Sequence, residues 1–206
     1  MTGFPDVRHG PLALSDIADL REYERVRDRI RSQVIELKKL RRVSLGDIVT
    51  VVFENRETIR FQIQEMARAE KMVSDDAVQA ELDTYNPLIP AAGELSATLF
   101  LELRSEEELR RWLPSLVGIE RSVELRLGAD GSEVLQCLPE EAHAAQLTRD
   151  DVTASVHYIR WTLDAEQIRR FADGPVGLAV RHPSYDASAE LSEPTRRSLL
   201  SDLQPD

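Results

Sequence analysis

The polar residues with the clearest potential for chemistry gather where an apolar strand is predicted to run into a helix. Residues 47–70 begin with dense apolar side chains, turn at Asn55 and continue with helical spacing. At the turn, Glu54, Asn55 and Arg56 stand where the free backbone N–H groups of a helix start point outward, a geometry that can hold an anionic group. Polar side chains farther along the helix extend this candidate site: Gln62, Gln64, Glu65 and Arg68.

Two interpretations of this polar cluster stay open. On a helical wheel Gln62 and Glu70 fall among apolar positions, and a polar group on a packing face must find a partner or a ligand. The cluster is therefore either a structural network buried in the fold or a pocket for a small ligand or substrate. Three residues elsewhere in the sequence are candidates to complete such a pocket: Tyr85, Asn86 and His182.

Recognisable catalytic and metal motifs are missing from the sequence, so we expect no catalytic residues, no metal site and no cofactor. There is no zinc motif, phosphate loop or dinucleotide fingerprint. Glu140 and His143 have the spacing of two metal ligands on one helix face, but a di-iron bundle needs two such pairs and two further Glu. The single cysteine, Cys137, is expected to be a small buried apolar residue, because no base lies near it in the sequence.

The charge pattern argues against nucleic acid and for a protein partner. A formal net charge of −11 repels phosphate polymers and anionic lipid. Residues 21–42 nevertheless hold nine Lys or Arg against four Asp or Glu. This basic segment is either a solvated helix face with internal ion pairs or a docking surface for an acidic partner. Arg25, Arg29 and Lys38 are its candidate contact residues.

The elements that must position these side chains follow from the apolar periodicity. Interior strand character is predicted for 47–53, and strict alternation over 94–104 predicts a strand with one face in water. In 151–163 the apolar residues change parity near Tyr158, which predicts a bulge or a strong twist there. The chain is expected to be α+β, with a mainly antiparallel sheet of about six strands, a long N-terminal helix over 17–40 and several short helices.

Domain organisation and location follow from composition. Residues 1–13 are predicted to be a flexible arm, and residues 14–206 a single α+β domain, because no linker-like segment divides them. No apolar run approaches the roughly 20 residues of a membrane span, and the N-terminus lacks the pattern of a signal peptide. We therefore expect a cytoplasmic protein that does not bind membranes.

Six segments of the sequence are familiar from other proteins: YERVR at 23–27, FENRET at 53–58, QIQEMARAE at 62–70, YNPLIP at 85–90, ELSATL at 94–99 and HPSY at 182–185. They resemble a bacterial family of uncharacterised proteins, catalogued as a domain of unknown function. Members of that family are often encoded near rubrerythrin-like and iron–sulfur oxidoreductase proteins, so the resemblance implies a link to redox or oxidative-stress metabolism. It implies no catalytic residues.

Two functional hypotheses follow from these residues. The first is a non-enzymatic accessory protein that binds a protein partner, with a homo-oligomer as a further possibility. It uses the basic helix and the corner between Glu54 and Arg68. The second is a small-ligand-binding protein or enzyme with its pocket at that corner. The pocket hypothesis requires the polar side chains to converge on one cavity, whereas the partner hypothesis requires an exposed apolar or basic patch beside the long helix.

Overall fold

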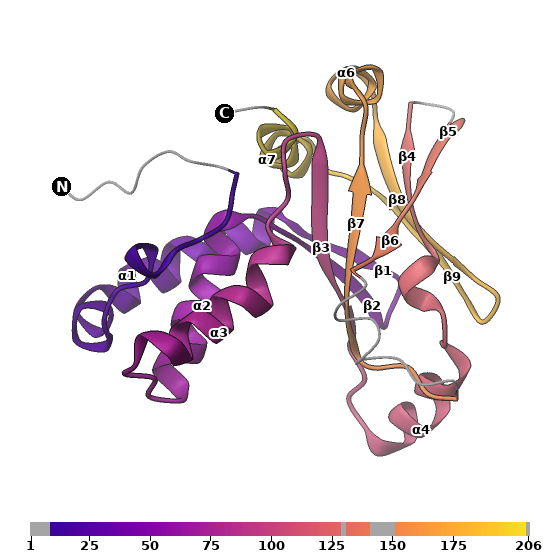
Figure 1. Cartoon of the computed structure of the whole chain (residues 1–206). Helices are drawn as coiled ribbons and strands as arrows, with labels where there is room; N and C mark the ends of the chain where they lie inside the picture. Colours follow the sequence, from indigo (N-terminus) through magenta and orange to yellow (C-terminus); the bar gives the residue numbers. More distant parts are fainter. Residues whose placement is uncertain (1–8, 129–130, 141–150, 205–206) are drawn as a thin grey trace.

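The computed structural model describes residues 9–128, 131–140 and 151–204, which form antiparallel strands in two sheets and a separate layer of helices (Figure 1). The prediction of an α+β fold with antiparallel pairing is confirmed. The expected sheet of about six strands is replaced by nine strands within the described residues. One sheet has the order β1-β2-β3-β7-β6 and comprises Arg42–Leu45, Val49–Glu54, Glu94–Leu101, Val156–Thr162 and Leu138–Pro139. The other has the order β5-β4-β8-β9 and comprises Glu133–Gln136, Val123–Leu127, Val176–His182 and Tyr185–Glu190.

The main hydrophobic core draws its side chains from both sheets. The rings of Phe53 on β2 and Trp161 on β7 lie 5.8 Å apart at its centre, and both residues are buried. The chain passes from β5 to β6 at buried Cys137. On the opposite side, the Tyr185 hydroxyl of β9 donates a hydrogen bond of 2.6 Å to the carbonyl oxygen of Leu45 in β1. The sheets are thus connected along two edges around one core.

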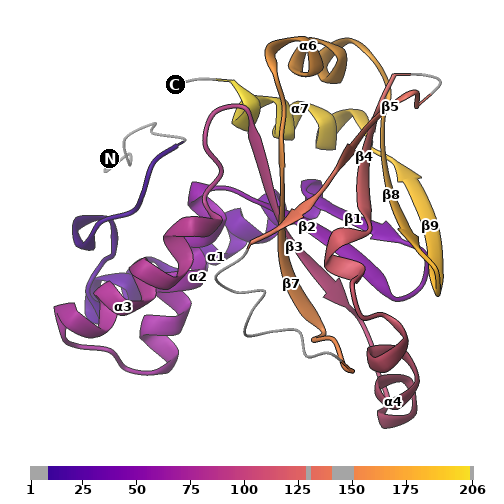
Figure 2. The same cartoon turned by 45° about the vertical axis from the view of Figure 1, so that its right-hand side comes forward.

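Three helices form a layer on the outer face of the first sheet: α1 (Leu20–Leu40), α2 (Arg56–Ala69) and α3 (Asp75–Tyr85) (Figure 1). A second, smaller core lies within this layer, built from Leu12, Ile59, Ile63, Leu82, Leu88 and Ile89. Helices α6 (Ala165–Asp173) and α7 (Glu193–Leu203) lie at one end of the sheets, and α4 (Glu106–Ser115) lies at the other (Figure 2). Short 3-10 turns are η1 (Leu14–Asp16), η2 (Asn86–Leu88) and η3 (Ile119–Arg121).

The corner between β2 and α2 forms as its sequence predicts. Strand β2 is buried along its whole length and lies between β1 and β3, which confirms its interior position. Asn55 is the N-cap of α2: its side chain accepts a hydrogen bond of 3.0 Å from the backbone N–H of Thr58. The Asn55 backbone N–H donates in return to the Thr58 hydroxyl at 2.9 Å. Strand and helix are therefore joined without a loop, and this fixes the direction in which α2 leaves the sheet.

Two edge strands were missed because their patterns are short. In β1 only Val43 and Leu45 are buried, which is too few residues to reveal alternation after a long helix. In β9 the inward residues are Tyr185, Ala187 and Ala189, two of which are too small to read as core. The long helix begins at Leu20, capped by Asp19, and not at 17, because residues 14–16 form η1 instead.

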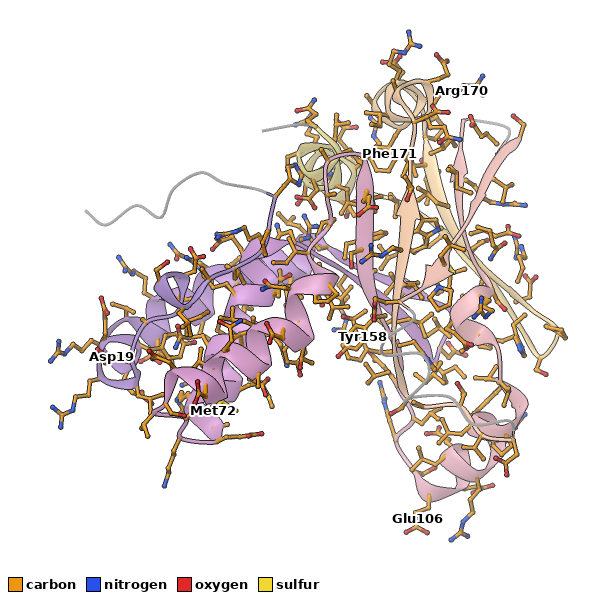
Figure 3. The ribbon with its side chains drawn as sticks, viewed as in Figure 1. Asp19, Met72, Glu106, Tyr158, Arg170 and Phe171 are labelled. Atoms are coloured by element: carbon orange, nitrogen blue, oxygen red, sulfur yellow. The ribbon has the colours of Figure 1, made fainter. Side chains whose placement is uncertain are left out.

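The helical layer covers one face of the first sheet, and for this reason the polarity of β3 and β7 led to wrong predictions about their exposure and regularity. Strand β3 was expected to face water with Ser96 and Thr98, yet only 3% and 5% of these residues is exposed, because the helices cover that face. Of the two predictions for the segment near Tyr158, the bulge is wrong, because β3 and β7 pair residue for residue without an insertion. His157, Ile159 and Trp161 face the main core in regular alternation, and Tyr158 points towards the helical layer (Figure 3).

Candidate functional site

Glu54, the first residue of the candidate site, is buried and bonded inside the protein. One carboxylate oxygen accepts a hydrogen bond of 2.8 Å from the hydroxyl of Thr98 on β3. The other lies 3.8 Å from the ammonium nitrogen of Lys38. The Lys38 side chain is only 33% exposed and its ammonium group faces Glu54. We therefore no longer count Lys38 among the residues expected to contact a partner.

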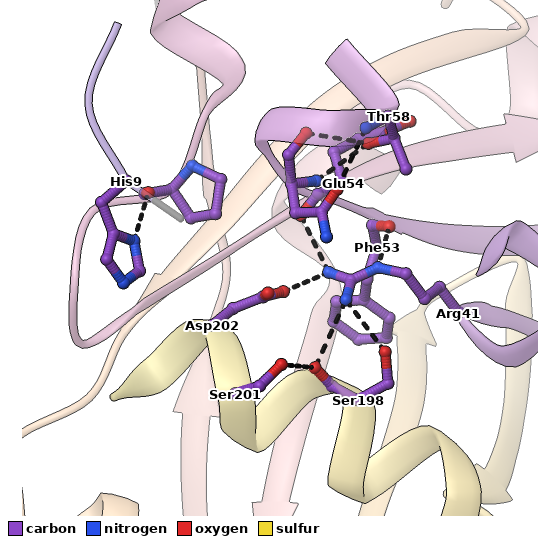
Figure 4. Close-up of polar contacts among 10 residues, drawn as sticks. His9, Arg41, Phe53, Glu54, Thr58, Ser198, Ser201 and Asp202 are labelled. Atoms are coloured by element: carbon purple, nitrogen blue, oxygen red, sulfur yellow. Dashed lines mark hydrogen bonds and ion pairs between the residues drawn. The ribbon is translucent and has the colours of Figure 1, made fainter. Parts of the chain in front are cut away.

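A buried arginine cluster lies beside this corner and holds α7 against the first sheet (Figure 4). The guanidinium of Arg41 donates to the carbonyl oxygens of Phe53 and Glu54 at 2.9 and 3.0 Å. It also donates to the Ser198 hydroxyl at 3.1 Å and forms an ion pair with Asp202. Burial raises the pKa of Asp202, while Arg41 opposes the rise. Because Arg41 is fully buried and its donors are engaged, this cluster is structural.

Three other candidate residues fasten residues 12–18 to the helical layer. The Asn86 side chain accepts from the Leu12 N–H at 2.7 Å and donates to the Leu12 carbonyl at 2.9 Å. Gln64 pairs with the Ala18 peptide in the same way, at 3.0 and 2.9 Å. Between them, Arg56 forms an ion pair of 2.9 Å with Asp16. Leu12 is consequently buried, although it belongs to the predicted arm, whose residues 1–8 lie outside the described part of the chain.

Glu65 joins α2 to α1. It accepts a hydrogen bond of 2.6 Å from the Tyr23 hydroxyl and two of 2.8 Å from the Arg27 guanidinium. The bond with Arg27 is the main reason that the pKa of Glu65 lies below its usual 4.5. One turn farther along α2, Arg68 donates to Glu24 of α1 at 2.7 Å. Both candidate residues therefore form the contact between two helices.

Replacing Glu65 with Gln is expected to flatten the acid dependence of stability. A carboxyl whose pKa is lowered in the folded state stabilises it above the unfolded pKa, and this contribution disappears as pH falls through the folded value. The wild type should therefore lose stability below about pH 4.5, and the Gln variant should lose less over that interval. Urea unfolding at a series of pH values measures the difference, and parallel profiles for the two proteins would contradict it.

The remaining candidate residues are also engaged within the chain. Gln62 forms a side-chain hydrogen bond with Tyr85. The Nε2 atom of His182 lies 3.0 Å from the carbonyl oxygen of Val117, and its Nδ1 atom accepts from Ser184 N–H at 3.2 Å. Glu70 is exposed, so its predicted place on the packing face of α2 is wrong. The candidate residues thus form separate internal contacts, and among the hollows lined by described residues none gathers them together.

The helical layer itself contains a groove between α1 and α2. It has a volume of about 330 Å³, and part of its lining is apolar: Val26, Ile30, Val34 and Phe61. Arg29 lines it from α1, and Gln64 is the one residue of the predicted corner pocket that reaches it. Charged residues complete the lining: Asp16, Asp19, Glu22, Glu57 and Arg60. Two of them, Glu57 and Arg60, form an ion pair with each other.

A row of arginines follows α1 beside this groove. Arg21, Arg25 and Arg29 are spaced four residues apart and all are exposed. None of the three forms an ion pair with another residue in the described part of the chain. Arg25 and Arg29 are two of the three predicted contact residues. The third, Lys38, is not part of this row, and Arg21 was not among the predicted contacts. The predicted partner-binding residues are therefore partly brought together here.

Among the described residues, the buried titratable groups between the sheets form no recognisable catalytic or metal site. Burial raises the pKa of the Cys137 thiol to about 12, and burial lowers the pKa of His157. Within the described ranges no three His, Cys, Asp or Glu side chains are placed to hold a metal ion. No metal site was expected from the spacing of Glu140 and His143, and His143 lies outside those ranges. No helix among the described residues has the length and apolarity to cross a membrane.

Comparison with known proteins identifies the family. The family described as "Protein of unknown function (DUF3501)" matches residues 11–203. The chain belongs to this family. A solved structure of a novel protein of unknown function from Burkholderia pseudomallei is similar, with 34% sequence identity and a TM-score of 0.85 over 95% of this chain and 100% of that one. No curated protein matches the chain.

Membership of DUF3501 confirms the resemblance seen in the sequence, while the implied link to redox proteins stays a prediction. Sequence reasoning missed Arg41, Asp202 and Phe61. The first two are ordinary charged residues 161 positions apart, and no local pattern pairs them. Phe61 could have been found, because it is a large apolar side chain outside the apolar stripe of α2 defined by Ile59, Ile63 and Met66.

Proposed function

We propose that this member of the family is a non-enzymatic accessory protein that binds a partner protein through α1 and the adjoining groove. The observation that carries the proposal is the exposed row Arg21, Arg25 and Arg29. The chain has 37 acidic residues for 26 basic ones, so an acid is abundant near most arginines. Arg21, Arg25 and Arg29 nevertheless form no ion pair within the described residues, although the charge of Asp19 acts on the first two, so a negative group of another molecule would find this row available.

Engagement of the corner residues supports the partner hypothesis over the pocket hypothesis. A ligand pocket needs polar groups that are free to turn towards the ligand. Gln64, Glu65 and one carboxylate oxygen of Glu54 are hydrogen bonded within the fold, and the other oxygen of Glu54 lies 3.8 Å from the Lys38 ammonium without a hydrogen bond. Removing them from that role would leave buried partners unsatisfied. The groove between α1 and α2, by contrast, offers apolar surface next to unpaired charge, a combination found where proteins bind one another.

A redox-related partner and a cytoplasmic location complete the proposal. The resemblance implies the first. The one thiol of the chain is buried and has a raised pKa, so it is poorly suited to thiol exchange. Thiol-based redox chemistry would accordingly belong to the partner, and this protein would act as its accessory.

Reversing the arginine row is expected to abolish partner capture. The variant changes Arg21, Arg25 and Arg29 to Glu, and affinity capture from the native lysate is compared with that of the wild type. We expect recovery of specific partners to fall at least about tenfold, because like charges then face one another across the interface. A matched control changes three other exposed arginines by the same total charge: Arg104, Arg121 and Arg31. Arg31 is on α1, but two residues after Arg29 it lies on the opposite side of the helix from that residue.

The control variant should capture the same proteins as the wild type. Both variants change exposed side chains that lack ion pairs in the described residues, so their unfolding midpoints should stay close to that of the wild type. Recovery of an unchanged set of proteins by the reversed row would refute the proposed surface. Equal losses with both variants would also refute it, since the effect would then come from net charge alone.

A further inference from the structure

We infer that this surface recognises an acidic segment of the partner that carries two apolar anchor side chains, one for each of two neighbouring hollows. The inference rests on the proposed function and specifies the class of partner. One hollow is the groove between α1 and α2. The second, here called the outer hollow, lies at the end of the helical layer where Asp19 and Met72 are found (Figure 3). Its volume is about 420 Å³.

The outer hollow has an apolar lining that is open to solvent. Val73 is 88% exposed and Leu14 is 36% exposed, values that are high for large apolar residues. Other apolar residues extend this lining: Ile17, Leu20, Met72 and Val78. An apolar patch of this kind indicates a contact with another apolar group. Ile17, Ala18 and Asp19 line both hollows, so the hollows adjoin and are separated by this segment alone.

The arginine row connects the two hollows. Arg21 lines the outer hollow, Arg29 lines the groove, and Arg25 stands between them on α1. At a rise of about 1.5 Å per residue, the row extends about 12 Å along the helix. A helical segment of the partner covers a similar length in about seven or eight residues. Two apolar anchors at that separation, with acids between them, would fill both hollows and pair with the row.

Local charge favours an acidic segment despite acids in the lining. Asp16 is paired with Arg56 at 2.9 Å, and Glu57 is paired with Arg60. Asp19 is occupied as the N-cap of α1, where it accepts from two backbone N–H groups at 2.8 and 2.9 Å. Within the described residues, Glu22 at the groove and Asp75 at the outer hollow form no ion pair, so the partner's acids should lie on the arginine side.

The net charge of the chain decides between acidic partners. At physiological salt the Debye length is about 8 Å, so a short peptide segment responds mainly to the local row. A nucleic acid or an anionic membrane is larger and meets the field of the whole protein, which has a net charge of −11. A protein segment is therefore the acidic ligand that this surface fits.

An unbiased peptide selection tests the inference. Random peptides of about 16 residues, long enough for two such anchors, are displayed and selected on the full-length protein. Peptides that bind the reversed-row variant (Arg21, Arg25 and Arg29 changed to Glu) are discarded. We expect the enriched peptides to carry a net negative charge and two large apolar residues about seven or eight positions apart. Enrichment of neutral or basic peptides, or no enrichment at all, would overturn the inference.

Variants of each hollow then locate the anchors of a selected peptide. The double variant Leu14→Ser/Val73→Ser alters the outer hollow, and Phe61→Ser alters the groove. Each should weaken binding about tenfold in fluorescence anisotropy, whereas the control with Arg31, Arg104 and Arg121 changed to Glu should bind as the wild type does. Full affinity in either hollow variant, with a native unfolding midpoint, would show that only one anchor exists and would overturn the two-anchor inference.

Failure of this inference can be told apart from failure of the proposed function. If capture from the lysate depends on the arginine row but no acidic two-anchor peptide is selected, the partner surface stands and its ligand is of another kind. If capture does not depend on the row, the proposed function itself fails, whatever peptides are selected.

Discussion

Replacing Arg41 with Met is expected to lower the free energy of unfolding by about 3–5 kcal/mol, the range for breaking a buried ion pair by removing one partner. Asp202 would keep a carboxylate in a site where only 5% of the residue is exposed. The carbonyl oxygens of Phe53 and Glu54 would also lose their donor. Urea unfolding monitored by circular dichroism measures the change, which is a large share of the roughly 5–15 kcal/mol typical of a domain.

The next residue in the sequence supplies the matched control. Arg42 also forms an ion pair, with Glu102, but the two side chains are 49% and 34% exposed. Arg42→Met should therefore change stability by less than about 1 kcal/mol. Similar losses for the two substitutions would contradict the role given to Arg41. Combining Arg41→Met with Asp202→Leu should recover part of the loss, because no uncompensated charge is then buried.

Arg41 also marks the limit of what the sequence can predict. Its partners come from β2 and from α7, and the ion pair spans 161 residues. At the sequence level Arg41 is one of nine basic residues in a helical segment and cannot be told apart from Arg42, which faces solvent. Burial of a charged side chain depends on which distant element packs over it, and local spacing contains no information about that.

Local signals were more reliable where the physics is local. The Asn55 cap depends on residues three apart, and the interior position of β2 depends on apolar side chains within one strand. The prediction that Ser96 and Thr98 face water failed, because polarity shows what a residue is and not what covers it. Thr98 can be buried because its hydroxyl donates a hydrogen bond to the Glu54 carboxylate.

The candidate site shows the same difference between local patterns, which the sequence reveals, and tertiary contacts, which it does not. The sequence correctly directed attention to 47–70 and to the basic helix, because both are unusual in composition. It could not show that Gln64 is occupied by the Ala18 peptide or that Lys38 turns towards Glu54, since these partners are supplied by folding. The arginine row is predictable only in part. Spacing places Arg21, Arg25 and Arg29 on one side of α1, but their lack of ion pairs within the described residues is a property of the folded chain.

Phe53 and Phe61 allow stability and function to be separated within residues 47–70. Phe53 is fully buried and packs against Trp161 at the centre of the main core. Phe53→Ala should therefore lower the free energy of unfolding by about 3–5 kcal/mol, the sum of lost apolar transfer and the cavity that remains. Urea unfolding measures this loss, and a change below about 1 kcal/mol would show that the core is not centred on β2.

Phe61→Ala is the counterpart on the next element, with the same atoms removed. Phe61 is half-buried and lines the groove, so solvent already reaches the site and no closed cavity remains after truncation. The loss of stability should stay near 1 kcal/mol, while capture of the partner should fall about tenfold because an apolar wall of the groove is gone. If Phe61→Ala destabilised the protein as strongly as Phe53→Ala, Phe61 would be a core residue and the groove would be a packing defect of the helical layer. If it left both stability and capture unchanged, the partner would have to be held by the arginine row alone.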